Sequence, residues 1–280
     1  MRQAPCLLVT LSGFEACYHP NPIDGATIAQ MIREKRATIL LATPTFLLAY
    51  LRRAQREDFV SLRAVLTGAE KLRTKIADAF EERFGIRPLE GYGATELSPV
   101  VCVAVPDVTA DGIRHQGTKE GSVGHPIPGV TVRTLDPDTL APVGRGREGL
   151  LMVRGPNVMP GYLDNPAKTQ EVLRDGWYVT GDVAVIDEDG FVFLLDRMSR
   201  YSKIGGEMVP HMAIEEKFLH GLGTAGQVVF VASAPDERKG EQLIVFYTDE
   251  AGSPERLHDI MAKSDLPNLW KPRKENYFRI

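Results

Sequence analysis

The sequence predicts an α/β protein built from three successive parts, and three changes of pattern along the chain support this prediction. Strand-like and helix-like segments alternate over residues 1–116, short strands rich in glycine and proline follow over 117–195, and helices return with strands over 196–280. Alternating strands and helices are typical of a parallel sheet flanked by helices, whereas short runs between turn residues are typical of antiparallel structure. We therefore expect an α/β subdomain, a small antiparallel β subdomain and a small α+β domain.

The first part has a readable order of elements. Asp24 is placed to cap a helix over about Gly25–Lys35, whose apolar residues have helical spacing. The other elements expected here are an apolar strand-like run at Cys6–Leu11, a strand at Thr38–Ala42, a helix opening at Pro44, a strand at Arg63–Thr67, and a helix from about Arg73 to Phe84 stopped by Gly85. Ligands collect at the carboxyl ends of parallel strands, where Gly68–Glu70 and Gly91–Glu96 both fall.

The second and third parts are also divided by turns. Strands are expected at Thr131–Leu135, Gly149–Arg154, Val183–Asp187 and Phe191–Leu195. The charged, glycine-bearing segment Asp196–Gly206 suits a hinge. Beyond it we expect a helix at about Met212–His220, strands at Gln227–Ala232 and Gln242–Tyr247, and a helix at about Pro254–Lys263.

Composition narrows the class of protein. The chain has 280 residues, of which 43% are hydrophobic and 25% charged, and its net charge is −4. A negative balance argues against nucleic-acid binding, and no apolar run reaches the roughly 20 residues that span a membrane. The start lacks the pattern of a secretory signal. Three cysteines without CxxC spacing indicate a reducing compartment and no zinc site, so we expect the cytoplasm.

The stretch Gly91–Glu96 carries the strongest chemical signal. Its glycines let the backbone approach a ligand closely, and Tyr92 between them can lay its ring on a flat base. Thr95 can donate a hydrogen bond to a phosphate oxygen, and Glu96 can hold a hard cation. The pattern favours a nucleotide phosphate with Mg²⁺, with a plain glycine-rich turn as the alternative.

Three blocks together extend this interpretation. Gly91–Glu96, Trp177–Asp182 and Asp196–Arg197 occur in an order and spacing that resemble the adenylate-forming superfamily of acyl-CoA synthetases, acyl-ACP synthetases, peptide-synthetase adenylation domains and luciferases. Lys203–Val209 looks most like the acyl-ACP synthetase and 2-acylglycerophosphoethanolamine acyltransferase branch. The resemblance implies the later part of an adenylate-forming large domain followed by a small C-terminal domain, with ATP or AMP and Mg²⁺ as cofactors. The family's upstream phosphate loop and its Pro-x-x-x-x-Gly-Lys motif are not found, so we expect a fragment of a longer enzyme.

The resemblance implies a role for each matching residue. Thr95 would contact the phosphate, Glu96 would hold Mg²⁺, and Lys203 would serve thiol transfer. The residues expected to bind the nucleotide are Gly68, Ala69, Glu70, Tyr92, Gly93, Thr95, Asp182 and Arg197. Asp182 would accept hydrogen bonds from both ribose hydroxyls, presented by a turn at Thr180 and Gly181. Each has a plainer alternative as a turn or surface residue.

Some positions depart from the family or stay open. The family's hinge residue is Asp or Lys, and Ser199 stands at that position, which leaves the hinge assignment open. His211 is expected to be a cap or surface residue without a catalytic role. Five apolar residues are expected to pack in the core rather than to line an acyl pocket; they are Phe46, Leu47, Val65, Leu97 and Val100. Trp177 and Trp270 are likewise expected to be packing residues.

The implied reaction joins a carboxylic acid, expected to be a fatty acid, to AMP and then to the thiol of acyl carrier protein. A CoA ligase that shares the first step is the nearest alternative. A non-catalytic adenine-nucleotide-binding module and a carrier-protein docking module are alternatives of other classes. The whole protein is a candidate for membrane association.

Overall fold

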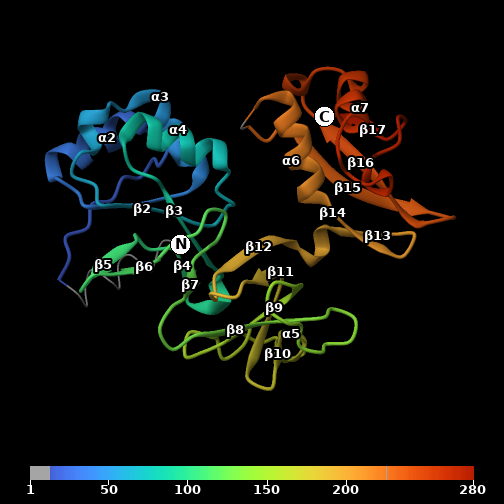
Figure 1. Ribbon diagram of the computed structural model, residues 1–280, viewed down its shortest axis with the longest axis horizontal. Helices are drawn as coiled ribbons and strands as arrows, with labels where there is room; N and C mark the ends of the chain where they lie inside the picture. The colour runs from blue at the N-terminus through green and yellow to red at the C-terminus, as the bar shows by residue number, and fades with distance from the viewer. Residues whose placement is uncertain (1–12, 225) are drawn as a thin grey trace. The chain divides into compact units, whose positions relative to one another are not determined.

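The computed structural model describes residues 13–224 and 226–280, and within them the chain has the predicted mixed α/β fold (Figure 1). Two compact units are present among the described residues: one contains residues 13–180 and 184–194, and the other contains Gly181–Val183 and residues 195–224 and 226–280. The strand-like run expected at Cys6–Leu11 lies outside the described residues.

A parallel sheet with helices on one side begins the first unit (Figure 1). Strands β1 (Ile39–Ala42), β2 (Ala64–Thr67) and β3 (Leu89–Gly93) run parallel, and β4 (Val100–Val103) and β7 (His125–Pro126) extend the sheet antiparallel. Helices α2 (Gly25–Lys35), α3 (Pro44–Arg53) and α4 (Thr74–Phe84) accompany them, with a short 3₁₀ turn η1 (Arg56–Phe59). The parallel sheet predicted from the alternation of strands and helices is confirmed.

Local capping chemistry explains the ends of these helices. The Asp24 carboxylate accepts hydrogen bonds from the backbone and the hydroxyl of Thr27, which caps α2. Thr43 caps α3 just before Pro44, and Gly85 ends α4 in the left-handed conformation that glycine adopts without strain. The predicted bounds of α2 and α4 and the predicted start of α3 are confirmed.

The rest of the first unit is mostly antiparallel. It holds the hairpin β5 (Val108–Ala110) and β6 (Ile113–His115), and a sheet ordered β10 (Leu173–Arg174), β11 (Trp177–Ile186), β9 (Glu148–Arg154) and β8 (Thr131–Leu135), with β12 (Val192–Arg197) beside β11. Helix α5 (Pro166–Val172) precedes β10. Inward-facing residues of this sheet share one core with the end of the parallel sheet: Leu97, Val101, Cys102, Val123, Leu151, Val153, Tyr178, Ala184 and Val192.

The second unit is a small α+β fold with its own core. Its sheet is ordered β14 (Glu207–Pro210), β13 (Tyr201–Ile204), β16 (Gly240–Tyr247) and β15 (Val229–Asp236), with β17 (Tyr277–Arg279) parallel to β16. Helices α6 (His211–Leu222) and α7 (Pro254–Ala262) pack with it, together with the short turns η4 (Asp249–Ala251) and η5 (Asn268–Trp270). Phe218, Val231, Val245 and Leu257 are fully buried between these elements.

One local expectation is wrong and another stays a prediction. The segment Asp196–Gly206 comprises the end of β12, the turn η3 (Met198–Arg200), the strand β13 and a hairpin turn, and its role as a hinge stays a prediction. The expected turn at Thr180 and Gly181 lies inside the continuous strand β11, where Gly181 has φ +77°. A glycine between two polar residues suggested a turn, but the pairing of β11 with its neighbouring strands outweighs that preference.

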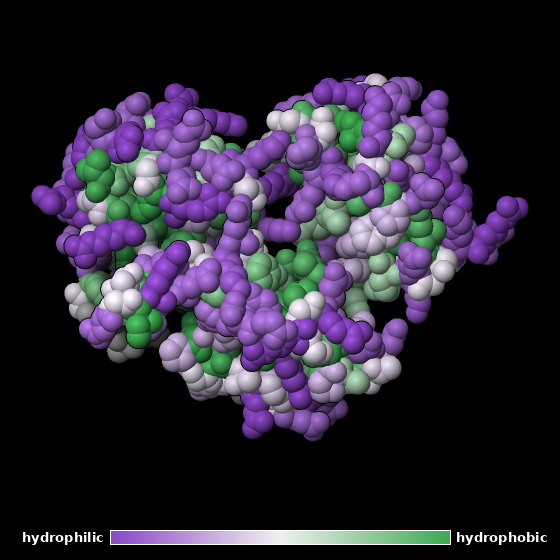
Figure 2. All heavy atoms as spheres, viewed as in Figure 1, coloured by the Kyte–Doolittle hydropathy of each residue, from purple (hydrophilic) through white to green (hydrophobic). Residues whose placement is uncertain are grey.

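The surface is mainly polar in the view of Figure 2, with apolar side chains showing between the hydrophilic ones. Strand β1 exposes Ile39 and Leu41 by 54% and 53%, while Leu40 and Ala42 on its other face are buried. Within the described ranges, none of the helices combines the length and the apolarity required to cross a bilayer.

Candidate active site

Glu96 lies in a short turn that follows the parallel strand β3. Residues Thr95–Leu97 form the 3₁₀ turn η2, and Leu97 is completely buried in the core shared by the two sheets. Thr95 is exposed and Glu96 is half-buried. The buried leucine therefore anchors the turn, so that the preceding hydroxyl and carboxylate point away from the core.

Glycine is required at position 93 by the neighbouring strand. A Cβ atom added there would lie 1.7 Å from the carbonyl oxygen of Pro99, and the register between β3 and β4 shifts between Tyr92 and Gly93. No larger residue fits that approach without moving backbone. The Gly-Tyr-Gly pattern thus has a packing reason in addition to any contact with a ligand. Tyr92 itself is partly buried against the core.

A later segment of the chain holds the Glu96 turn. The Tyr162 hydroxyl donates to Oε1 of Glu96 at 2.8 Å, and the Met159 backbone N–H donates to the Glu96 carbonyl at 2.8 Å. Asn157 donates through Nδ2 to the carbonyls of Leu97 and Val100 at 3.0 and 2.9 Å. Sequence reasoning missed these three residues, because their contacts join positions about 60 residues apart.

The phenol of Tyr162 responds to this contact. Its pKa is raised above the usual value, first by the hydrogen bond to Glu96 and then by burial, while a hydrogen bond with Tyr178 opposes the rise. The hydroxyl therefore stays protonated and remains a donor to the carboxylate throughout the physiological range.

The second predicted segment, Gly68–Glu70, follows the adjacent parallel strand. Leu66 pairs with Leu89 and Thr67 pairs with Glu90, so the carboxyl ends of β2 and β3 are neighbours. The structure therefore brings Gly68–Glu70 to the same edge of the sheet as the Glu96 turn.

The loop after β2 is held from two sides. Ala69 has φ +72°, a conformation that costs a non-glycine residue free energy. Glu70, expected as a wall of the nucleotide site, accepts hydrogen bonds from the hydroxyl and backbone N–H of Thr45, at 2.6 and 3.3 Å. On the other side, Leu72 N–H donates to Oε1 of Glu90 at 3.1 Å. The strained residue is thus flanked by two carboxylate contacts.

Glu90 has an unusual electrostatic environment. Burial raises the pKa of its carboxyl to about 7, although the hydrogen bond from Leu72 and the charge of Lys71 act in the opposite direction. Sequence reasoning did not single out Glu90, because nothing in the residue order indicates that its side chain turns inward beside the loop.

Asp182 and Arg197 are brought together in the second unit. Arg197 Nε lies 3.2 Å from Oδ1 of Asp182, since β11 and β12 pair side by side. The Asp182 side chain is only 12% exposed, whereas that of Arg197 is 71% exposed. The preceding residue, Asp196, accepts from Met212 N–H at 2.9 Å and so satisfies a free donor at the start of α6.

Lys203 lies in the hairpin β13–β14 and is exposed. The two-residue turn of this hairpin is Gly205–Gly206, with φ values of +58° and +90° that glycine tolerates. The backbone N–H of Lys203 donates to the Glu241 carboxylate.

Arg200, next to Ser199, takes part in a partly buried polar network. Arg200 donates to Oε1 of Glu215 at 2.5 Å and lies over the ring of Phe230 at 4.7 Å. Burial raises the pKa of Glu215, while Arg200 and the N–H of Val231 act against the rise. Arg200 therefore fastens the segment to the second unit.

The expectation that His211 is a cap or surface residue is wrong. Its side chain is 5% exposed, and Nε2 lies 2.5 Å from Oγ of the fully buried Ser202. Burial, with a contribution from Arg200, lowers the pKa of His211 to about 4. The first residue of α6 therefore faces inward, where its ring meets Ser202 of β13.

The five apolar residues expected to pack in the core differ in how deeply they are buried. Leu47, Val65 and Leu97 are completely buried, Phe46 is partly buried, and Val100 is 37% exposed. The first three therefore belong to the core, as expected.

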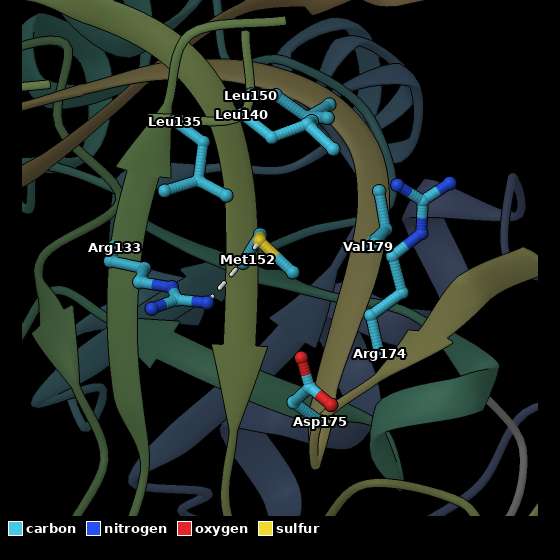
Figure 3. Close-up of a pocket in the computed structure, with 8 residues that line it drawn as sticks. All are labelled: Arg133, Leu135, Leu140, Leu150, Met152, Arg174, Asp175 and Val179. Atoms are coloured by element: carbon cyan, nitrogen blue, oxygen red, sulfur yellow. Dashed lines mark hydrogen bonds between the residues drawn. The ribbon is translucent and has the colours of Figure 1, made fainter. Parts of the chain in front are cut away.

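A cavity of about 160 Å³ lies on the outer face of the β8–β9–β11 sheet and contains none of the predicted site residues (Figure 3). Five apolar residues, two arginines and an aspartate line it: Leu135, Leu140, Leu150, Met152, Val179, Arg133, Arg174 and Asp175. Arg133 stacks over the ring of Trp177 at 4.0 Å. Trp177 is thus a packing residue of this face.

The donor set restricts which metal fits. Across residues 13–224 and 226–280, no three His, Cys, Asp or Glu side chains gather as a metal cage. Glu96 offers one carboxylate, and a single phenol donor does not saturate its lone pairs. One or two carboxylates with waters and substrate phosphates are the usual ligands of Mg²⁺, so the site fits Mg²⁺ that arrives with a nucleotide.

The chain is similar to known proteins in sequence and in structure. The chain is 35% identical over 257 residues to a long-chain-fatty-acid–CoA ligase of Yersinia pestis, covering 90% of this chain and 44% of that protein. It is 33% identical over 238 residues to a feruloyl-CoA synthase of an Amycolatopsis species, covering 84% and 46%. The chain spans about half the length of these relatives.

Among solved structures, ATP-bound MatB from Rhodopseudomonas palustris superposes with a TM-score of 0.76 at 26% identity, over 92% of this chain and 49% of that one. The O-succinylbenzoate coenzyme A synthetase of Bacillus subtilis, in complex with ATP and magnesium ion, shares the fold with a TM-score of 0.76 at 23% identity, over 91% and 50%. The sequence pattern of the AMP-binding enzymes matches residues 1–163, which is more than half of the chain. This chain belongs to the AMP-binding enzyme family.

Proposed function

We propose that this chain forms the adenylate-binding part of an ATP-dependent, AMP-forming ligase that activates a carboxylic acid and transfers the acyl group to a thiol. Family membership and the two CoA-ligase relatives support the reaction class. The observation that carries the proposal is the Glu96 turn, where a hydroxyl and a carboxylate follow the carboxyl end of the parallel strand β3, at the edge of the sheet that also holds Gly68–Glu70.

In this proposal each residue of the first unit has a defined task. Thr95 donates to a phosphate oxygen, and Glu96 holds Mg²⁺. Bound Mg²⁺ would supply charge neutralisation to the phosphates. The ring of Tyr92 stacks on adenine while Gly93 lets the backbone approach, and Gly68–Glu70 walls the same pocket. Fixed donors that need no rearrangement lower the cost of the charge that builds up as the acid attacks the α-phosphate.

In the second unit Asp182 accepts from the ribose hydroxyls, and Arg197 serves as a fork of donors to ribose or phosphate. Lys203, exposed on its hairpin, is proposed for the thiol-transfer step. Because Arg200 is held by Glu215, we place any pivot of the second unit before Arg200, at Arg197–Ser199. Changes in the backbone dihedral angles of a few residues are sufficient for a domain rotation of this kind.

The finer assignment concerns the acid and the thiol. The sequence Lys203–Val209 favours a fatty acid and acyl carrier protein, and the relatives' names favour CoA. Both acceptors present the same phosphopantetheine thiol, so they differ in the surface that recognises the carrier.

Calorimetric titration of the 280-residue chain with ATP and Mg²⁺ tests the nucleotide site. We expect binding that falls at least about tenfold in Thr95→Ala and Glu96→Gln, since each removes a charge-assisted contact. Glu171→Gln, an exposed carboxyl on α5 (side chain 63% exposed), is the matched control and should leave binding unchanged. A folded chain that binds no adenine nucleotide would contradict the proposal.

Acid-dependent exchange of pyrophosphate into ATP then separates a ligase from a binder. We expect palmitate-dependent exchange by the longer protein that contains this chain, followed by acyl transfer to acyl carrier protein or to CoA when each is supplied. Nucleotide binding without exchange for any carboxylic acid would favour the non-catalytic binding module.

A further inference from the structure

The structure places one residue outside the predicted site in direct contact with the proposed metal ligand. Tyr162 donates its hydroxyl to Oε1 of Glu96 at 2.8 Å, across 66 positions of sequence. Both residues lie in the first unit and both are half-buried. The hydroxyl is therefore a fixed neighbour of the carboxylate rather than one of many mobile surface contacts.

Hydrogen bonds at the start of helix α5 fix the backbone position of Tyr162. The backbone N–H of Tyr162 donates to Oγ1 of Thr169 at 2.9 Å, and that hydroxyl donates in turn to the carbonyl of Asn165 at 2.9 Å. The Asn165 side chain accepts from Lys168 N–H at 3.0 Å and caps helix α5. The start of a helix thus fixes the backbone from which the phenol extends.

Gly161, which precedes Tyr162, allows the backbone to lie close to Thr169. Gly161 has φ +156°, and a Cβ atom there would lie 2.9 Å from Cγ2 of Thr169. The backbone approaches the threonine closely only because residue 161 has no side chain.

The contact is one of two that the segment 159–162 makes with Glu96. Met159 donates its N–H to the carbonyl of Glu96 at 2.8 Å, so the segment holds both the backbone and the side chain of that residue. A free glutamate side chain samples several rotamers and loses that freedom when it binds a cation. A carboxylate already held through one oxygen presents its other lone pairs in a defined direction.

We propose that Tyr162 is a positioning residue that orients the Glu96 carboxylate for the Mg²⁺ of a bound Mg–nucleotide complex. This proposal rests on the proposed function. Metal-ligating carboxylates are commonly hydrogen-bonded by such outer residues, and their removal typically costs 10- to 100-fold in metal affinity. Tyr162 acts through Glu96 and does not itself need to touch the metal or the nucleotide.

The test compares nucleotide binding with and without Mg²⁺. ATP is titrated calorimetrically into the chain in Mg²⁺ and in EDTA, for the wild type, Tyr162→Phe, Glu96→Gln and the double variant. Tyr50→Phe is the matched control, because Tyr50 is also in the first unit and donates its hydroxyl to a carbonyl, that of Pro22, at 3.1 Å. Thermal unfolding of every variant verifies that it folds.

We expect Tyr162→Phe to lower the affinity measured in Mg²⁺ by about tenfold or more and to leave the affinity in EDTA unchanged. Glu96→Gln should remove the benefit of Mg²⁺, and adding Tyr162→Phe to it should have no further effect, because the two residues act as one unit. Tyr50→Phe should match the wild type in both buffers.

The outcomes separate this proposal from the proposed function. A wild-type chain whose ATP affinity does not depend on Mg²⁺ would overturn both the role of Glu96 and the positioning role. A Mg²⁺-dependent wild type with an equally dependent Tyr162→Phe would overturn the positioning role alone. An equal loss in Mg²⁺ and EDTA would assign Tyr162 to the general structure of the turn and also overturn the proposal.

Discussion

Replacing Glu90 by glutamine should make the first unit more stable above neutral pH. The carboxyl has an ordinary pKa of 4.5 and a pKa of about 7 in the folded chain, because burial disfavours its ionised form. Between these values the folded state binds more protons than the unfolded state, so stability falls as the pH rises. At 1.36 kcal/mol for each pKa unit, the full penalty above pH 7 is about 3 kcal/mol.

The glutamine variant isolates the charge from the hydrogen bond. Its side-chain carbonyl can still accept from Leu72 N–H, which lies 3.1 Å from Oε1 of Glu90, so the tether to the loop is kept. Below pH 4.5 both carboxyl and amide are neutral, and we expect nearly equal stabilities. The advantage of Glu90→Gln should then grow between pH 4.5 and 7 and level off above pH 7.

Urea unfolding at a series of pH values measures this difference. Tryptophan fluorescence in a Trp270→Phe background reports on Trp177, which lies in the same unit as Glu90. Glu171→Gln, an exposed carboxyl, is the matched control and should show no such growth. A Glu90→Gln variant whose advantage is constant with pH, or is largest at pH 4.5, would refute the reasoning.

Three further predictions follow from single contacts. Gly93→Ala should destabilise the first unit by about 3 kcal/mol in urea unfolding, because the added methyl meets the backbone of the neighbouring strand; unchanged stability would contradict the close approach. Glu215→Ala should destabilise the second unit by about 3–5 kcal/mol, since it removes the buried acceptor shared by Arg200 and the Val231 N–H and leaves Arg200 only the Asp196 carboxylate, 3.8 Å away; a loss below about 1 kcal/mol would mean that water reaches the pair. Asp182→Ala should weaken AMP binding about 100-fold with little change in Tm, measured by calorimetry, whereas the comparison variant Asp249→Ala, whose carboxylate also pairs with an arginine, should bind normally.

Local signals predicted the parallel part of the fold well. The capping residue Asp24, the proline after Thr43 and the terminal glycine at position 85 act within a few residues of one another, so residue order contains the necessary information. The edge of the sheet that holds Gly68–Glu70 and Gly91–Glu96 followed from strand alternation alone.

Non-local pairing explains what the sequence did not indicate. The expected turn at Thr180 and Gly181 lies within strand β11, which pairs with β9, β10 and β12. His211 resembled a cap or surface residue, yet it is buried and its ring meets Ser202 of β13. Tyr162 carried no sequence signal, because its role depends on a contact with Glu96 across 66 positions. Such contacts are decided by tertiary packing, which overrides local preference.

The ion pair between Arg197 and Asp182 changes what the proposed ribose contact requires. Residue order suggested a carboxylate with two free oxygens, one for each ribose hydroxyl. In the structure Arg197 Nε lies 3.2 Å from Oδ1 of Asp182, and its side chain is largely exposed while the aspartate is not. An exposed arginine is held by a pair worth about 1 kcal/mol or less, so a ligand hydroxyl can displace it or share the oxygen. In the proposed site, a displaced Arg197 would keep its charge beside the nucleotide, where a guanidinium binds phosphate through two parallel donors. Under that proposal the same ion pair would keep Asp182 oriented without nucleotide and release a phosphate-binding group once ribose arrives.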